Sequence, residues 1–163
     1  MERVEPDRSP AAAPDGERSF DLFYEDAWTR SVRLAALLTQ DSSVAEEIAQ
    51  DAFVAVMDRW SSLDEPAGYL YRCVTNAAML YHRSAGTARR KLLLVGIPEP
   101  ARPEFDHLAD AVASLQFRQR AVIVLRYYLQ LSEREIADAL GCRPGTVKSL
   151  ASRALSRLHK ELS

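Results

Sequence analysis

The residues best suited to chemistry in this chain are cations near its C-terminal end. Residues 143–160 contain five lysines or arginines and no aspartate or glutamate. On a helix, where successive side chains turn by about 100°, the small and cationic residues of this segment gather on one side. That side carries Gly145, Lys148, Ser149, Ser152, Arg153 and Ser156. Small side chains let a helix enter the major groove of DNA, where lysine and arginine bind phosphates or guanine edges. The pattern predicts a DNA-contacting helix face.

Two helices and a tight turn would position that face. Ser132 and Glu135 form the S-x-x-E signal of a helix start, because each side chain bonds an otherwise unpaired backbone amide. Gly141 can adopt the left-handed backbone that ends a helix, and Pro144 suits the first position of the next one. The second helix would bury its apolar side, made of Val147, Leu150, Ala151, Ala154, Leu155 and Leu158. This arrangement is a helix-turn-helix.

An amphipathic surface helix that is basic by chance would share the charge pattern. It would not require a capped helix and a glycine turn directly before it, so the complete motif favours DNA binding.

The rest of the chain offers no competing chemistry. Cys73 and Cys142 lack the spacing of a metal site or a disulfide framework, the three histidines are scattered, and no nucleophile–base set is evident. We therefore expect no metal, no cofactor and no enzymatic activity.

Two further patterns bear on location. The sequence has no run of 18 apolar residues, which a membrane-spanning helix would need. The N-terminus is charged and rich in proline and alanine, unlike a signal peptide. The sequence therefore predicts a cytoplasmic protein without membrane insertion.

Charge is distributed unevenly along the chain, although the formal net charge is only −2. Residues 20–68 hold ten acidic and three basic residues, whereas residues 69–103 hold one acidic and six basic residues. Such asymmetry suggests two surfaces with different partners, one a protein and one a polyanion. Solvated helix surfaces of mixed sign are the alternative interpretation.

Apolar residues at spacings of three and four predict helices throughout, and strand patterns are absent, so the fold class is all-α. Three helices are expected before residue 85, with a capping box of Ser43 and Glu46 at the start of the second. Their apolar stripes include Leu37, Met57 and Leu80. Further helices are expected over about 105–114 and 117–129, ahead of the helix-turn-helix.

Composition divides the chain into two small helical domains joined by a linker. Residues 1–18 are expected to form a disordered leader, 19–85 an N-terminal domain, 86–103 a linker bounded by glycine and proline, and 104–163 a C-terminal helix-turn-helix domain. The linker contains an apolar run at 92–95, which could dock on a partner or pack on one of the domains.

Several segments resemble the extracytoplasmic-function (ECF) sigma factors of bacterial RNA polymerase. "LSEREIADALGCRPGTVKS" resembles their C-terminal helix-turn-helix, and "LQFRQRAVIVLRYY" is similar to the helix before it. "AEEIAQDAFVAVMDRW" resembles the segment that grips the clamp helices of the polymerase, and "GYLYRCVTNAAMLYHRS" resembles the helix that melts the −10 promoter element. The resemblance implies a protein that directs core RNA polymerase to promoters, with promoter DNA and an anti-sigma factor as further partners.

The resemblance also implies roles for individual residues. Polymerase binding would fall to Glu47, Gln50, Asp51 and Phe53. Contacts with the −10 element would come from Arg72, Asn76, His82 and Arg83. Contacts with the −35 element would come from Arg143, Thr146, Lys148, Ser149, Ser152 and Arg153. An asparagine can bond a base turned out of the stack, and an arginine can hold a phosphate.

Departures from the family pattern concern the helix-turn-helix and the aromatic residues. Leu150 stands where these proteins often carry arginine, and it falls near the apolar side of its helix. Tyr69 and Tyr71 lie near the −10 residues, but helical spacing favours a core position for Tyr69.

A stand-alone helix-turn-helix regulator is the competing hypothesis, with residues 20–84 as a dimerisation or ligand domain. Such a regulator usually binds symmetric half-sites as a dimer. The sequence shows no obvious heptad pattern of apolar residues through which a dimer would pack.

Overall fold

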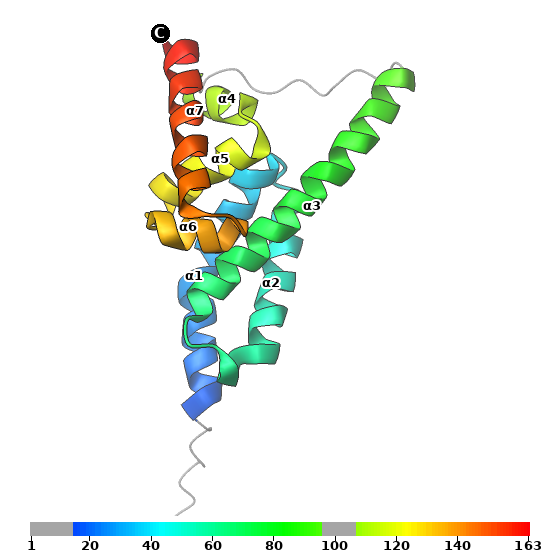
Figure 1. Ribbon diagram of the computed structural model, residues 1–163. Helices are drawn as coiled ribbons and strands as arrows, with labels where there is room; N and C mark the ends of the chain where they lie inside the picture. Colours follow the sequence, from blue (N-terminus) through cyan, green and yellow to red (C-terminus); the bar gives the residue numbers. More distant parts are fainter. Residues whose placement is uncertain (1–14, 96–106) are drawn as a thin grey trace, which may run out of the picture.

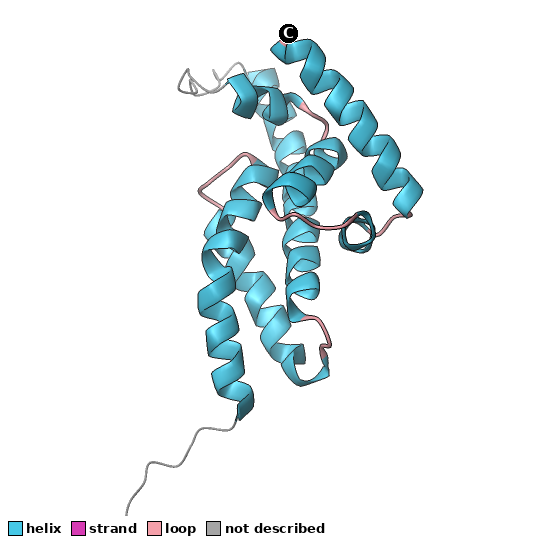
Figure 2. Ribbon diagram, turned by 90° about the vertical axis from the view of Figure 1, so that its left-hand side faces the viewer, coloured by secondary structure: helices cyan, strands magenta, loops and turns pink. Residues whose placement is uncertain are grey.

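The computed structural model describes residues 15–95 and 107–163, with side-chain surroundings for 20–85 and 107–163. This part of the chain contains helices and no strand, which confirms the all-α class (Figures 1 and 2). The helices are α1 (Asp15–Thr39), α2 (Ala45–Arg59), α3 (Pro66–Val95), α4 (His107–Ser114), α5 (Phe117–Ile123), α6 (Glu133–Leu140) and α7 (Pro144–Leu162). A 3₁₀ turn, η1 (Trp60–Ser62), follows α2, and a π-helical turn, η2 (Val124–Tyr128), follows α5.

An N-terminal unit forms where α1, α2 and α3 pack against one another. Each helix turns an apolar stripe inward, and Leu34, Val56 and Leu70 are completely buried. Three residues of the predicted stripes are largely outside this core: Leu37, Met57 and Leu80 are 37%, 53% and 65% exposed. Each lies at the edge of its stripe, where helix curvature and crossing decide which side chains meet a neighbour.

The turn between α1 and α2 differs from the predicted capping box of Ser43 and Glu46. Helix α2 begins one residue before Glu46, and no side chain caps it. Instead the Asp41 carboxylate accepts bonds from the amide and the hydroxyl of Ser43, at 2.9 and 2.6 Å. The other oxygen of Asp41 accepts a bond from the Tyr81 hydroxyl of α3. A carboxylate is the stronger acceptor, so Asp41 organises the turn and Ser43 is its donor.

The C-terminal unit contains the predicted helix-turn-helix. Ser132 and Glu135 form a complete capping box at the start of α6, and Gly141 ends that helix with a left-handed φ of 60°. Pro144 occupies the first position of α7. On α7, Val147, Ala151, Ala154 and Leu158 are buried as predicted, whereas Leu155 is 42% exposed. The capping box, the glycine and the proline therefore predicted both helices and the turn between them.

The predicted boundaries differ from the observed helices at two places. Residues 15–18 of the predicted leader belong to α1, and residues 86–95 of the predicted linker belong to α3. Figure 1 shows this last part of α3 leaving the helical bundle. The apolar run at 92–95 thus continues a helix across Gly86, which lowers helix propensity without ending a helix. The rest of the leader and of the linker lies outside the described residues.

The two units pack directly against each other. One continuous apolar cluster includes Leu38 and Val74 of the N-terminal unit together with Phe117, Ala121 and Ile136 of the C-terminal unit. Helix α3 packs on α6, and α1 contacts both α5 and η2. The structure therefore joins the two predicted domains through an extensive interface.

Candidate DNA- and polymerase-binding surfaces

The outer face of α7 carries the residues predicted to contact the −35 element. Arg143, Thr146, Lys148, Ser149, Ser152 and Arg153 are all exposed. Arg143 precedes the helix with an extended backbone, so its side chain stands at the N-terminal end of α7. Backbone amides and the positive end of the helix dipole favour a DNA phosphate at such a terminus. The face has the geometry that a major-groove helix requires.

Glu133 of α6 and Leu150 of α7 lie beside this outer face of α7. Glu133 of α6 lies 3.8 Å from the Lys148 ammonium group and 3.7 Å from the Arg126 guanidinium group. Lys148 is 73% exposed, so this ion pair is weak and a phosphate can compete with it. Leu150 is partly buried against the core, as its calculated direction predicted. Leu150 therefore contributes to the packing of α7 on the core.

A second candidate face lies along α3. Arg72, Asn76 and Arg83 are exposed, and their spacing places them within roughly 40° of one another around the helix. His82 lies roughly 80° to 120° around the helix from these three residues. Its ring lies 5.4 Å from the ring of Phe117 on α5. Burial and the charge of Arg120 lower the pKa of His82. The structure thus groups three of the predicted −10 residues and places His82 at the contact with the C-terminal unit.

Aromatic and cationic side chains from two helices meet at the start of α3. The Arg72 guanidinium lies over the Tyr69 ring at 5.3 Å, and Arg59 of α2 lies over the same ring at 5.8 Å. The sequence did not indicate Arg59, because its approach depends on the crossing of α2 and α3. Tyr71 is the more deeply buried tyrosine, and its hydrogen bond raises the pKa of Arg30. Tyr69 packs against the core as predicted and is partly buried, and Tyr71 also belongs to the core.

The third candidate surface lies on α2. Glu47, Gln50 and Asp51 are exposed, as a protein-binding face requires. Phe53 is only 3% exposed and packs against Phe23 of α1, so its prediction as a direct contact needs correction. It forms the floor of an apolar hollow of about 300 Å³, which sequence reasoning missed. The hollow is lined by Phe20, Tyr24, Gln50, Phe53, Val54 and Met57. The sequence signal that could have revealed it is a pair of apolar residues, Val54 and Met57, which the structure leaves exposed.

Comparison with known proteins gives these surfaces their context. Residues 24–87 match the family model described as sigma-70 region 2, and residues 106–158 match that of sigma-70 region 4. The chain is 34% identical to the RNA polymerase sigma-E factor of Streptomyces coelicolor over 85% of this chain and 81% of that protein. It is 32% identical to the ECF RNA polymerase sigma factor SigL of Mycobacterium tuberculosis over 94% and 96% of the two chains.

The chain belongs to the ECF sigma factors. It is a factor that directs RNA polymerase to promoters and is not an enzyme. The match extends through both units in the family order, which decides against the hypothesis of a stand-alone helix-turn-helix regulator. Within residues 15–95 and 107–163, the sigma factor has no helix long and apolar enough to cross a membrane.

Solved structures share the fold of this sigma factor. One is the sigma factor RpoE in complex with the anti-sigma factor NepR from Bartonella quintana, with a TM-score of 0.71 and 21% identity over 89% of this chain and 97% of that one. Another is CnrH in complex with the cytosolic domain of CnrY, with a TM-score of 0.67 and 23% identity over 90% and 88% of the two chains. At this identity the likeness concerns the fold alone.

Proposed function

We propose that this sigma factor works through three separate surfaces, one for core RNA polymerase and two for promoter DNA. The exposed acidic and amide side chains of α2 bind the polymerase clamp, with Glu47 and Asp51 meeting basic side chains. The hollow beside Gln50 receives an apolar side chain of the same partner, and the buried Phe53 shapes its floor. Helix-to-helix recognition of this kind combines an apolar anchor with a charged rim.

The face of α3 binds the separated −10 strand. Asn76 offers one amide donor pair and one carbonyl acceptor to a base turned out of the stack, while Arg72 and Arg83 hold phosphates on either side of it. The observation that carries this assignment is that these three side chains are exposed and share one side of a helix. His82 is exposed at the margin of the face, beside Phe117 of α5, and adds a backbone contact.

The outer face of α7 enters the major groove of the −35 element. Lys148 and Arg153 bind phosphates or guanine edges, and the small Ser149 and Ser152 allow close approach. Each DNA contact is modest, so tethering both units to the polymerase raises the effective concentration of each surface at the promoter. We place the protein in the cytoplasm with the polymerase, and we propose an anti-sigma factor as its regulatory partner.

Run-off transcription tests this function. Core RNA polymerase is incubated with a library of genomic fragments, with and without the sigma factor, and the new transcript starts are mapped. We expect start sites that share spaced −35 and −10 elements. If none appear and the protein alone protects palindromic DNA as a dimer, the proposed function is wrong.

The Asn76→Ala variant locates the melting step. Loss of the base contact should reduce open-complex formation by roughly tenfold, while binding to core polymerase is unchanged because Asn76 is exposed on α3 and the proposed polymerase surface lies on α2. Permanganate footprinting of the opened strand measures this step. Thr29→Ala is the matched control, since Thr29 is an exposed polar residue of α1 outside all three surfaces. Equal opening by the Asn76 variant and the control would contradict the assignment.

A further inference from the structure

Two arginines from different helices lie over one tyrosine ring in the N-terminal unit. Arg59 is the last residue of α2, whereas Tyr69 and Arg72 belong to the first two turns of α3. The guanidinium carbons of Arg59 and Arg72 lie 5.8 and 5.3 Å from the centre of the Tyr69 ring. Both distances are typical of a cation over an aromatic ring. The ring therefore brings two positive charges from separate helices to one place.

Packing against the core fixes the positions from which these side chains extend. Trp60 follows Arg59 directly, and its ring lies 5.2 Å from the ring of Phe20 and 5.3 Å from that of Phe23 on α1. This contact anchors the end of α2. The Tyr69 ring is partly buried against the same core, while Arg59 remains exposed. The cluster therefore combines an anchored ring with cations that solvent can reach.

The thiol of Cys73, one turn after Tyr69 on α3, responds to both cations. Burial raises the pKa of Cys73, whereas the Tyr69 hydroxyl and the charges of Arg72 and Arg59 oppose that rise. The two guanidinium groups therefore act on the same neighbour, in agreement with their distances to the ring.

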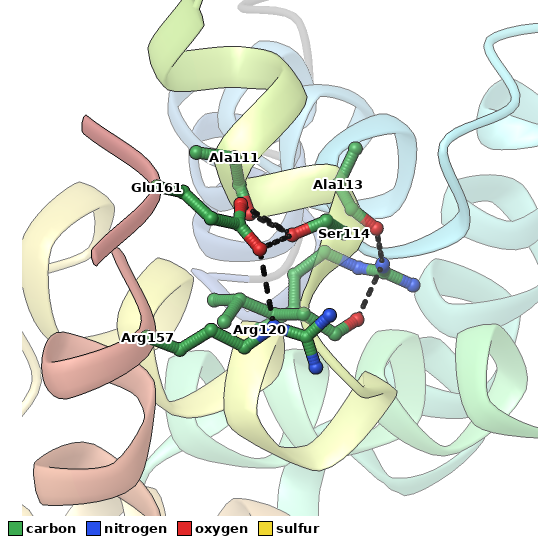
Figure 3. Close-up of polar contacts among 7 residues, drawn as sticks. Ala111, Ala113, Ser114, Arg120, Arg157 and Glu161 are labelled. Atoms are coloured by element: carbon green, nitrogen blue, oxygen red, sulfur yellow. Dashed lines mark hydrogen bonds and ion pairs between the residues drawn. The ribbon is translucent and has the colours of Figure 1, made fainter. Parts of the chain in front are cut away.

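Within the described part of the chain, no acidic side chain forms an ion pair with either of these two arginines. Other arginines show the contrast. Arg157 bonds Glu161 at 3.2 Å, and the Nη1 group of Arg120 donates to the carbonyl oxygens of Ala113 and Leu115 (Figure 3). A guanidinium without such partners offers its N–H groups in a planar fork that matches a phosphate.

The two arginines differ in their distance from the acidic residues of α6. Arg72 lines a pocket of about 770 Å³ that Glu135 and Asp138 of α6 also line. Arg59 is not part of this pocket and approaches the ring from the end of α2. Because like charges repel, an anion is favoured on the α2 side of the ring, away from the two α6 carboxylates.

We propose that Arg59 is a further DNA-binding residue, which holds the phosphate next to the one that Arg72 holds. This inference rests on the proposed role of α3 in −10 binding. Along α3, Asn76 is followed toward the N-terminal end by Arg72 and then by Tyr69, over which Arg59 lies. A strand that passes Asn76 and Arg72 in this direction reaches Arg59 next. The −10 surface thus extends from α3 onto the end of α2.

Salt dependence tests the phosphate contact in the full chain. The probe is a fluorescent oligothymidine of about 12 nucleotides, because a phosphate contact does not require a particular base. Each contact with a phosphate of a single strand contributes about 0.7 to the slope of log affinity against log salt concentration. Arg59→Gln should make the slope shallower by about that amount and weaken binding at low salt by roughly fivefold. Arg59→Lys keeps the charge and should retain the slope.

Arg33→Gln is the matched control for this experiment. It removes the same charge from an exposed arginine of α1, outside the proposed surfaces, and should leave the slope unchanged. If Arg59 only joins α2 to α3, its loss would lower the affinity by the same factor at every salt concentration. An Arg59→Gln slope equal to that of the parent would therefore overturn the proposal.

Neutral linkages locate the contact within the −10 strand. Oligonucleotides with the −10 sequence from the run-off experiment each carry one uncharged methylphosphonate, and their binding to holoenzyme is measured. At the phosphate that Arg59 holds, the neutral linkage should weaken the parent by roughly fivefold and the Arg59→Gln variant hardly at all. The same comparison with Arg72→Gln should identify the adjacent phosphate.

Equal losses for the parent and Arg59→Gln at every linkage would overturn the assignment of Arg59 to the −10 strand. Absence of run-off start sites would instead refute the proposed function. The salt dependence with oligothymidine would still decide whether Arg59 binds a phosphate.

Discussion

At the scale of single residues, Asp41 shows how one side chain can organise a turn and tie it to a distant helix. It accepts bonds from Ser43, two residues later, and from Tyr81, forty residues later. The Ser43 hydroxyl, the Tyr81 hydroxyl and the Ser43 amide, in that order of effect, lower the pKa of Asp41 from its ordinary value of 3.8. Because these bonds favour the charged carboxylate, folding favours its ionisation.

Removal of these donors should raise the pKa of Asp41. We expect a larger rise for Ser43→Ala than for Tyr81→Phe, since the Ser43 hydroxyl is the strongest donor. The depressed pKa contributes stability above pH 3.8, and this contribution is lost as the pH falls through the folded pKa. Both variants should therefore be destabilised near neutral pH and should approach the parent in acid. NMR titration of the Asp41 carboxyl carbon measures the pKa, and the reverse order of the two shifts would contradict this account.

At the scale of elements, only one of two serines with the same S-x-x-E spacing caps a helix. Ser132 caps α6: its hydroxyl oxygen accepts the Glu135 amide at 3.2 Å, and the Glu135 carboxylate accepts the Ser132 amide at 2.7 Å. Ser43 does not cap α2, because Asp41 takes its amide and its hydroxyl. The S-x-x-E spacing therefore gives a cap where the serine side chain turns toward the amides of the helix, and not where a preceding carboxylate holds the serine hydroxyl.

The cap of α6 gives a prediction about stability. Ser132→Ala removes the acceptor of the Glu135 amide, and such losses cost about 1 kcal/mol. We expect the free energy of unfolding to fall by about that amount, measured by chemical denaturation. Ser156→Ala, an exposed serine within α7, is the control and should be neutral or slightly stabilising because alanine favours helix. Equal stability of the two variants would show that the cap contributes nothing.

At the scale of the whole molecule, the contact between the two units includes a titratable histidine, His82. His82 faces Phe117 and the charged Arg120 of α5. Its pKa lies below the ordinary value of 6.5, because burial and the nearby cation both oppose the imidazolium form. The unfolded chain lacks both effects, so it binds more protons than the folded chain in mildly acidic solution.

The folded chain should therefore lose part of its stability as the pH falls. The contribution of His82 is complete above the ordinary pKa of 6.5 and decreases as the pH falls from there through the lowered pKa of His82. The free energy of unfolding, measured by chemical denaturation from about pH 7.5 to about pH 5.5, should decline in acid. His82→Gln should abolish the decline, whereas His159→Gln, at the far end of α7, should retain it. A decline that survives in the His82 variant would assign it to another group.

The sequence by itself determined the class of the fold, the helix-turn-helix and the outer face of α7. These features depend on contacts within a few residues, such as the Ser132–Glu135 cap and the left-handed Gly141, and on a helical period that any stable helix repeats. The family resemblance supplied the promoter-directing function, and comparison with relatives confirmed it.

Only the tertiary structure decided which side chains of the predicted faces are accessible. It buried Phe53, turned His82 toward Phe117 and brought Arg59 to Tyr69. It also made Arg120 the link between the ends of α1 and α4. Each outcome depends on how helices distant in sequence cross, and that crossing is set by the packing of whole apolar faces, which no local spacing encodes.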